Sequence, residues 1–221
     1  MKLTEGLYAY PWLDMMANNC NTYLLKGRLN ILVDPGHNAF LGKLFQAMKD
    51  DDIVPEEIDL VINTHAHPDH SEGNSFFQQD NTLITLHEDE DRYLKGEGAQ
   101  LYKLFGLEMS PFQAEFYLTE GWLELDDIYL EIYHTPGHSP GSICLYWPAK
   151  KALISGDVVF YQGVGRTDIP GADGELLKQS LDKLAQLDTE LLLPGHGDLV
   201  IGKDEVRDNY ALIQQYISKL L

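Results

Sequence analysis

Basic residues and cysteines are scarce in this 221-residue chain. It has 16 lysines and arginines against 35 aspartates and glutamates, which gives a formal net charge of −19 at pH 7. Such a charge repels phosphate backbones and anionic lipid surfaces, so we expect neither a nucleic acid nor a membrane as a partner. Only two cysteines, Cys20 and Cys144, are present. A disulfide framework and a C-x-x-C zinc site are therefore excluded.

Long apolar segments are missing as well. No segment approaches the roughly 20 apolar residues that a bilayer span needs. The N-terminal sequence MKLTEGLYAYPW lacks the apolar region of a secretory signal, so we expect a cytoplasmic protein.

Short apolar segments alternate with helical patterns along the chain, which indicates an α/β sandwich. Residues 88–120 combine charges with aromatic side chains, and we expect two or three helices there. The length and the absence of repeats favour one domain over residues 1–221, with 88–120 as a helical insertion. The expected strands are 21–26, 29–33, 59–63, 82–86, 128–133, 142–147, 151–155 and 190–193. The expected helices are 39–50, 175–187 and 204–220.

A histidine cluster directly follows the expected strand at 59–63. Within six residues stand His65, His67, Asp69 and His70. Side chains alternate along extended backbone, so His65 and His67 would point the same way and hold one metal ion. A turn after Pro68 would direct Asp69 and His70 toward a second position.

Three further side chains of the same types stand near the ends of later strands. They are His138, Asp157 and His196, and a glycine precedes each of them. Glycine lets the backbone turn sharply and approach an ion closely. Together with the ligand-type residues at 65–70, the chain offers five histidines and two aspartates, enough for two metal ions. Imidazole and carboxylate ligands without thiolate suit Zn²⁺, with iron or Mn²⁺ as alternatives.

The order and spacing of this series resemble the metallo-β-lactamase superfamily over nearly the whole chain. The resemblance implies a four-layer αββα sandwich, with two mixed sheets flanked by helices. It also implies a first metal on His65, His67 and His138, a second on Asp69, His70 and His196, and Asp157 bridging both. Asp34 matches an early family aspartate that would orient ligands, although a turn residue before Pro35 explains it equally well.

Two divalent ions that share a water lower its pKa from about 16 toward about 7. The resulting bridging hydroxide would attack the carbonyl carbon of a small acyl substrate. Asp69 can orient this nucleophile or accept its proton as well as bind metal. The chain is therefore predicted to be a dinuclear metallohydrolase.

Single residues separate the branches of the superfamily. Asp157 stands where β-lactamases carry cysteine or serine, so antibiotic hydrolysis is not expected. The segment from Gly163 to Asp168 resembles glyoxalase II-like hydrolases, and by that resemblance Arg166 would bind the substrate, most simply a thioester. Arg166 could instead pair with Asp168. Only 25 residues follow His196, too few for the helical tail with which glyoxalase II binds glutathione.

Other functions and roles stay open at this point. One is a mononuclear iron persulfide dioxygenase with iron on His65, His138 and Asp157. Others are a lactonase or ester hydrolase, and a member that uses its metals only for stability. His37, His87 and His134 do not fit the ligand series and are expected at the surface or at helix starts, with a ligand-orienting role open for His134.

Two segments are candidates for the substrate pocket: the loop Pro11 to Met16 and the insertion at 88–120. Apolar side chains there would bind the apolar part of a substrate. Ordinary core packing is the alternative, and the insertion could also form a homodimer interface. The candidate wall residues are Trp12, Met15, Phe112 and Phe116.

Overall fold

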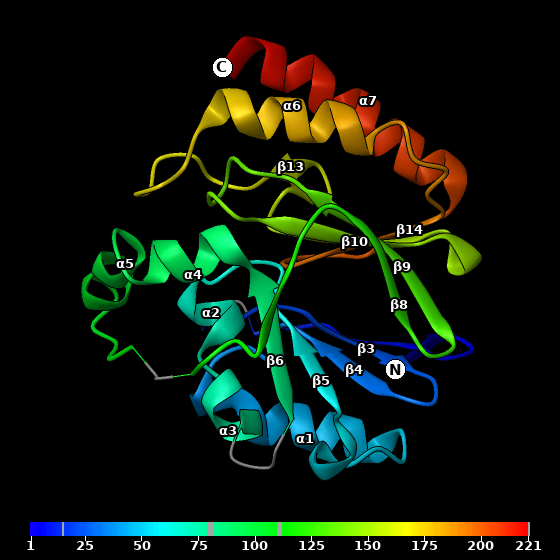
Figure 1. Cartoon of the computed structure of the whole chain (residues 1–221). Coiled ribbons are helices and arrows are strands. Elements are labelled where there is room, and N and C mark those ends of the chain that lie inside the picture. Colours follow the sequence, from blue (N-terminus) through cyan, green and yellow to red (C-terminus); the bar gives the residue numbers. More distant parts are fainter. Residues whose placement is uncertain (15, 79–81, 110–111, 221) are drawn as a thin grey trace.

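Two β-sheets lie face to face, and helices cover their outer faces (Figure 1). The computed structural model describes residues 1–14, 16–78, 82–109 and 112–220. Helices α1 (Leu41–Asp50) and α3 (Asn74–Gln78) cover one sheet. Helices α6 (Gly174–Leu184) and α7 (Lys203–Leu220) cover the other. This is the predicted four-layer αββα sandwich.

The first sheet has seven strands in sequence order. Its first four are antiparallel, and its last four, with β4 common to both sets, are parallel. The sheet is therefore mixed, as predicted. Its strands are β1 (Lys2–Thr4), β2 (Leu7–Tyr10), β3 (Thr22–Lys26), β4 (Asn30–Val33), β5 (Leu60–Ile62), β6 (Leu83–His87) and β7 (Phe116–Leu118).

The second sheet has six strands in the order β15-β14-β11-β10-β9-β8. Only the β11–β14 pair is parallel, so this sheet is mixed too. Its strands are β8 (Gly121–Leu125), β9 (Ile128–His134), β10 (Ile143–Trp147), β11 (Ala152–Gly156), β14 (Leu191–Pro194) and β15 (Val200–Ile201). A separate hairpin joins β12 (Val159–Phe160) and β13 (Gly163–Val164).

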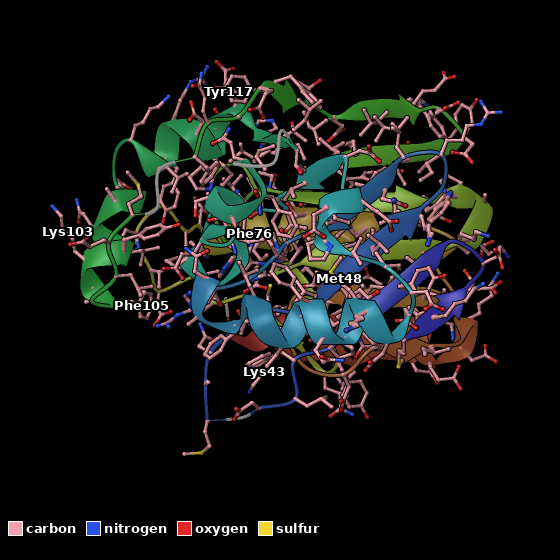
Figure 2. The ribbon with its side chains drawn as sticks, turned by 90° about the horizontal axis from the view of Figure 1, so that it is seen from below. Lys43, Met48, Phe76, Lys103, Phe105 and Tyr117 are labelled. Atoms are coloured by element: carbon pink, nitrogen blue, oxygen red, sulfur yellow. The ribbon has the colours of Figure 1, made fainter. Side chains whose placement is uncertain are left out.

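The central strands β5 and β10 are apolar and buried at every position because both of their faces are covered. On β4, Ile31 and Val33 pack between the two sheets, whereas Leu32 packs toward α1. The predicted apolar face of α1, which includes Leu44 and Met48, packs in the same layer as Leu32. Figure 2 views the molecule from the α1 side, with Met48 labelled on this helix.

The amphipathic stripes predicted for the last two long helices are also confirmed. Leu177, Leu181 and Leu184 of α6 pack with Val206 and Tyr210 of α7 against the second sheet. The side chains of Ile217 and Leu220, which the same stripe includes, lie outside the described ones. Within the described residues, no helix is long and apolar enough to cross a bilayer.

The helical prediction for residues 88–120 holds only in its first half. Helices α4 (Glu88–Leu94) and α5 (Gly98–Leu104) form there, but Phe116–Leu118 is strand β7, parallel to β6. The prediction is wrong at that point because sheet pairing, which the local pattern does not reveal, overrides it. The sequence patterns also missed β1, β2, β8, β12, β13 and β15. The remaining short helices are α2 (Pro68–Ser71) and the 3₁₀ turns Asn38–Phe40, Pro55–Glu57 and Pro148–Lys150.

Candidate metal centre

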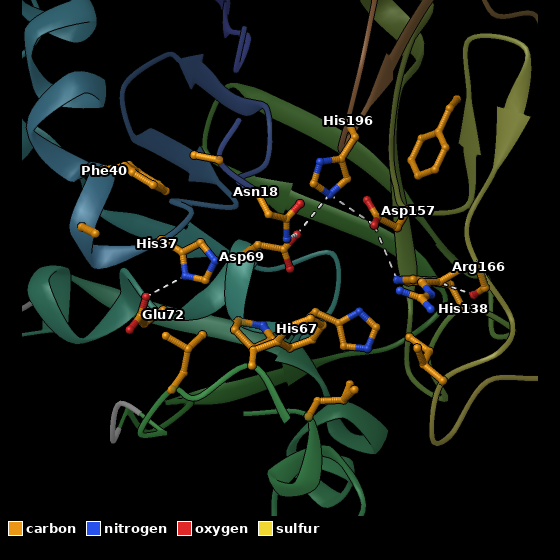
Figure 3. A pocket seen from close by; sticks show the side chains of 18 of the residues that line it. Asn18, His37, Phe40, His67, Asp69, Glu72, His138, Asp157, Arg166 and His196 are labelled. Carbon is orange, nitrogen blue, oxygen red and sulfur yellow. Dashed lines mark hydrogen bonds and ion pairs between the residues drawn. The ribbon is translucent and has the colours of Figure 1, made fainter. Parts of the chain in front are cut away.

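The predicted ligands meet between the two sheets because each follows a strand at the same end of the sandwich. His65 and His67 follow β5, Asp157 follows β11, His196 follows β14, and His138 lies between β9 and β10. Figure 3 shows His67, Asp69, His138, Asp157 and His196 converging on one cavity. Residues up to 131 positions apart in the chain therefore share one site.

Three imidazoles, which we call the first cluster, are His65, His67 and His138. Their ligand nitrogens lie within 4.8 Å of one another, and all three side chains are buried. Burial lowers the pKa of each ring, to about 3 for His67. The rings are therefore neutral at pH 7 and hold lone pairs for a cation.

Two of these rings have a tautomer assigned by their neighbours. Nδ1 of His138 donates to the carbonyl oxygen of Arg166 at 2.9 Å. Nδ1 of His65 lies 3.1 Å from the hydroxyl of Thr64, which itself donates to Asp34. Both arrangements place the proton on Nδ1 and the lone pair on Nε2.

The Nε2 atoms of His65 and His138 are buried and make no hydrogen bond to any residue in the described part of the chain. A buried nitrogen that lacks a partner is costly, and a bound metal ion would remove that cost. The first cluster thus fits a divalent ion with imidazole ligands.

A second cluster consists of Asp69, His70 and His196, whose ligand atoms also lie within 4.8 Å of one another. Nε2 of His196 is 3.2 Å from Oδ2 of Asp69 and 3.2 Å from Nε2 of His70. Burial by itself would lower the pKa of His196, but Asp157 and Asp69 raise it to about 10. Burial opposes ionisation of Asp69, but the hydrogen bond with His196 and the charge of His70 hold its pKa below the usual range.

Asp157 lies between the two clusters. Its Oδ1 is 3.2 Å from Nε2 of His70, and its Oδ2 is 3.5 Å from Nε2 of His138 and 3.4 Å from Nε2 of His196. Burial again opposes ionisation, but the charges of His196 and His70 hold the pKa of Asp157 well below its usual range. The carboxylate of Asp157 contacts rings of both clusters, which is the position expected of a bridging ligand.

Asp34 contacts the ligand loop as its proposed orienting role requires. Its Oδ2 accepts from Nδ1 of His70 at 2.9 Å and from the Thr64 hydroxyl at 2.6 Å. Its Oδ1 accepts from the Thr64 amide at 2.8 Å. A carboxylate that holds the far nitrogen of a histidine fixes the ring and raises its basicity.

Two glycines allow the close approach of these loops. Gly156 has a φ of +48°, and a Cβ there would lie 2.5 Å from the hydroxyl oxygen of Thr64. A Cβ on Gly195 would overlap Oδ1 of Asp157. The glycines before Asp157 and His196 are therefore required by the packing of the site itself.

Sequence patterns missed two polar side chains at the site. Nδ2 of Asn18 donates to Oδ2 of Asp69 at 2.8 Å, from a loop 51 residues away. Glu90 of α4 is fully buried and accepts hydrogen bonds from both ligand loops of the first cluster. Asn18 stands in no motif. The only signal for Glu90 was a charged residue in an otherwise inward-facing helical position.

A cavity of about 760 Å³ opens above the two clusters. The predicted insertion does contribute to it, through Leu101, Phe105 and Leu107 of α5 and the residues after it. Figure 2 shows Phe105 next to Lys103 of α5, at the outer edge of the molecule. The other apolar wall residues are Ala17, Ala39, Phe40, Pro68, Phe160, Val164 and Ile169.

The predicted wall residues themselves lie elsewhere. Trp12 stacks on Phe40, with ring centroids 4.6 Å apart, and lines a different cavity. Phe112 and Phe116 pack against the core, so packing is the correct interpretation for them. Met15 lies outside the described residues.

Arg166 lines the cavity, and it also pairs with Asp168. Its Nε and Nη2 donate to the two carboxylate oxygens at 2.7 and 2.9 Å. Both side chains are more than half exposed, so the pair contributes little to stability. The pairing alternative is confirmed, and Arg166 lies on the wall of the cavity (Figure 3).

The three other histidines differ in position. His37 lines the cavity and contacts Glu72 at 2.7 Å (Figure 3). His87 and His134 stack on each other with ring centroids 4.2 Å apart. They form a further possible ligand group with Asp89, but the rings are nearly parallel and Nδ1 of His87 already accepts from the Asp89 amide.

Comparisons with known proteins agree with this geometry. The sequence model of the metallo-β-lactamase superfamily matches residues 16–196. The probable metallo-hydrolase of Methanocaldococcus jannaschii is 36% identical over 185 residues, which cover 81% of this chain and 88% of that protein. The hydroxyacylglutathione hydrolase GloC of Haemophilus influenzae is 30% identical over 201 residues, which cover 86% and 91%.

Among solved structures, the B3 metallo-β-lactamase BLEG-1 superposes with a TM-score of 0.78 at 28% identity. The match covers 94% of this chain and 99% of that one. The fold, the clustered ligand types and these matches show that the chain belongs to the metallo-β-lactamase superfamily of metal-dependent hydrolases.

Proposed function

We propose that this protein is a dinuclear metallohydrolase that cleaves a small thioester. The observation that carries the proposal is Asp157, which contacts both clusters at the base of the cavity. His65, His67 and His138 would hold one ion, and Asp69, His70 and His196 the other. Two such ions, zinc by preference, would acidify a shared water and polarise a carbonyl oxygen.

Asp69 is the protein group that we assign to proton transfer. The net reaction adds water across the C–S bond: the acyl carbon gains the hydroxyl group, and the sulfur leaves as a thiol with the other proton. Asn18 and His196 both contact Oδ2 of Asp69 and hold this carboxylate in place. The low pKa of Asp69 keeps it ionised at neutral pH, so its carboxylate can accept a hydrogen bond from the attacking water and orient it.

The cavity supports an acyl substrate with an apolar arm. Most of its wall is aliphatic or aromatic, and the guanidinium of Arg166 on this wall is already paired with Asp168. A relative is named for glutathione thioester hydrolysis. We propose that this chain prefers thioesters whose carrier is smaller and less anionic than glutathione.

The test pairs metal analysis with a substrate panel. Protein loaded with zinc, iron or manganese would be assayed on S-lactoylglutathione, a neutral acyl thioester, a lactone and a β-lactam. We expect about two ions per chain and the highest kcat/KM on the neutral thioester. Asp69→Asn should lower kcat at least about 100-fold, whereas Asp198→Asn, an exposed aspartate two residues after His196, should not. Two bound ions without thioester hydrolysis would refute the proposal.

A second candidate, a mononuclear iron persulfide dioxygenase, uses the same residues. The Nε2 atoms that lack hydrogen bonds belong to His65 and His138, and Asp157 lies 3.5 Å from the latter. These three are the ligands that this activity requires. Oxygen uptake with glutathione persulfide by iron-loaded protein, at one ion per chain, would favour it over hydrolysis.

A further inference from the structure

Glu90 is a fully buried carboxylate that the proposed hydrolysis does not use. It lies on α4, outside the ligand series, and accepts three hydrogen bonds. Its Oε2 accepts from the amide of Ala66 at 2.7 Å. Its Oε1 accepts from the hydroxyl of Ser139 at 2.6 Å and from the amide of Gly141 at 2.7 Å.

The three donors belong to the two loops that carry the first cluster. Ala66 stands between His65 and His67, and Ser139 follows His138. One loop comes from the first sheet and the other from the second. Glu90 therefore joins, through a single side chain, the two segments whose separation sets the distances among the three imidazoles.

A carboxylate suits this position for a chemical reason. Its two oxygens only accept hydrogen bonds and offer about four acceptor sites, enough for all three donors. A glutamine amide would place its NH₂ group against at least one N–H or O–H. The structure shows no ion pair between Glu90 and any described cation, so these three bonds are what compensates its burial.

The backbone of α4 also packs closely against the loop that follows His138. A Cβ on Gly141 would lie 2.6 Å from the backbone nitrogen of Glu90. The start of α4 is thus packed directly on the turn after His138. A movement of α4 would shift this turn and the His65–His67 segment together.

We propose that Glu90 is a positioning residue that sets the geometry of the first metal position by clamping both ligand loops. The proposal rests on the proposed function in one respect, namely that His65, His67 and His138 bind metal. It gives the 88–120 segment a role at the metal centre in addition to its share of the cavity wall.

The test compares Glu90→Gln with Glu88→Gln. Glu88 lies on the same helix, is exposed and undergoes the same charge change. Zn²⁺ affinity would be measured by competition with a chromophoric chelator, the Co²⁺ absorption spectrum would report ligand geometry, and thermal unfolding would be followed on metal-free protein. Glu90→Gln should weaken the first-position affinity about 10- to 100-fold and change the Co²⁺ spectrum, and Glu88→Gln should do neither.

Three results would overturn the proposal. One is a Glu90→Gln protein that is less heat-stable but keeps wild-type Zn²⁺ affinity and Co²⁺ spectrum, since Glu90 would then act only on folding. If Glu90→Gln does not fold, Ser139→Ala removes one of the three donors, and an unchanged affinity there is the second. The third is a wild-type protein that binds no ion at the first cluster. Absence of thioester hydrolysis with normal metal binding would refute the proposed function alone, because the affinity measurement does not depend on it.

Discussion

The two clusters of the metal centre hold their side chains in different ways. In the first, three buried imidazoles are neutral, since burial lowers the pKa of each, and two Nε2 atoms have no hydrogen bond. In the second, His196 has a pKa raised to about 10 and lies between the carboxylates of Asp69 and Asp157. The first cluster offers the lone pairs of neutral imidazoles, whereas the side chains of the second cluster form ion pairs.

This difference shows how each cluster is organised before an ion arrives. The first cluster depends on the loops around it, through contacts such as those of Glu90 and of the Arg166 carbonyl. The second cluster is held by its own opposite charges, and an ion must displace protons from it. Within the described residues, two Nε2 atoms of the first cluster therefore lack a hydrogen bond without metal, whereas Asp69, His70 and His196 of the second each have a hydrogen-bond or ion-pair partner.

The largest effect on metal binding and activity is expected at Asp157, the residue that contacts both clusters and so belongs to neither side of the comparison. Asp157→Asn keeps the size of the side chain but removes the charge that faces His70, His138 and His196. We expect loss of bound metal from both clusters and a fall in kcat/KM of at least about 100-fold. Metal analysis and thioester kinetics measure both. Retention of two ions by Asp157→Asn would contradict the bridging role.

A smaller effect should separate the clusters in the metal-free state. His196→Gln leaves Asp69 and Asp157 without the imidazolium between them, and we expect a loss of about 1–3 kcal/mol in the free energy of unfolding, since this site is partly exposed. His67→Gln breaks no ion pair among the described residues and one side-chain hydrogen bond, the 3.5 Å contact with Tyr93, and we expect about 1 kcal/mol or less. Urea unfolding in chelator measures both. Equal losses would show that the ion pairs do not hold the second cluster.

The smallest effect extends the comparison to His87, a neutral histidine outside both clusters. Burial and the stacked His134 lower its pKa below the ordinary value of 6.5. The unfolded chain then binds a proton more readily than the folded one, so this contribution to stability is present above pH 6.5 and is lost as pH falls toward the folded pKa. His87→Asn retains an acceptor for the Asp89 amide, which His87 bonds as an N-cap.

Wild type should therefore lose more stability between pH 7 and about pH 5.5 than His87→Asn does. Urea unfolding at the two pH values provides the measurement. Because both proteins keep the same ligand histidines, the difference between them isolates His87. A variant with the same pH dependence as wild type would show that His87 does not titrate in this range.

Much of the site could be predicted because its signals are local. Four ligand-type side chains stand within residues 65–70, and glycines stand before Asp157 and His196. The apolar strands that precede them were also readable, because strands buried on both faces are continuous apolar runs. The short edge strand β7 was missed because its pairing with β6 depends on residues about 30 positions away.

By itself, the sequence determined which ligand-type side chains would gather at one site: the donor types, their order and their places at strand ends follow from residue identity and local backbone period. Only the tertiary structure decided what surrounds those atoms. Asn18 on Asp69, Glu90 across two loops, and a cavity wall from Leu101 and Phe105 rather than Trp12 and Phe112 are contacts between distant segments. Such contacts have no periodicity along the chain, because they arise when two sheets and the α4–α5 segment pack together.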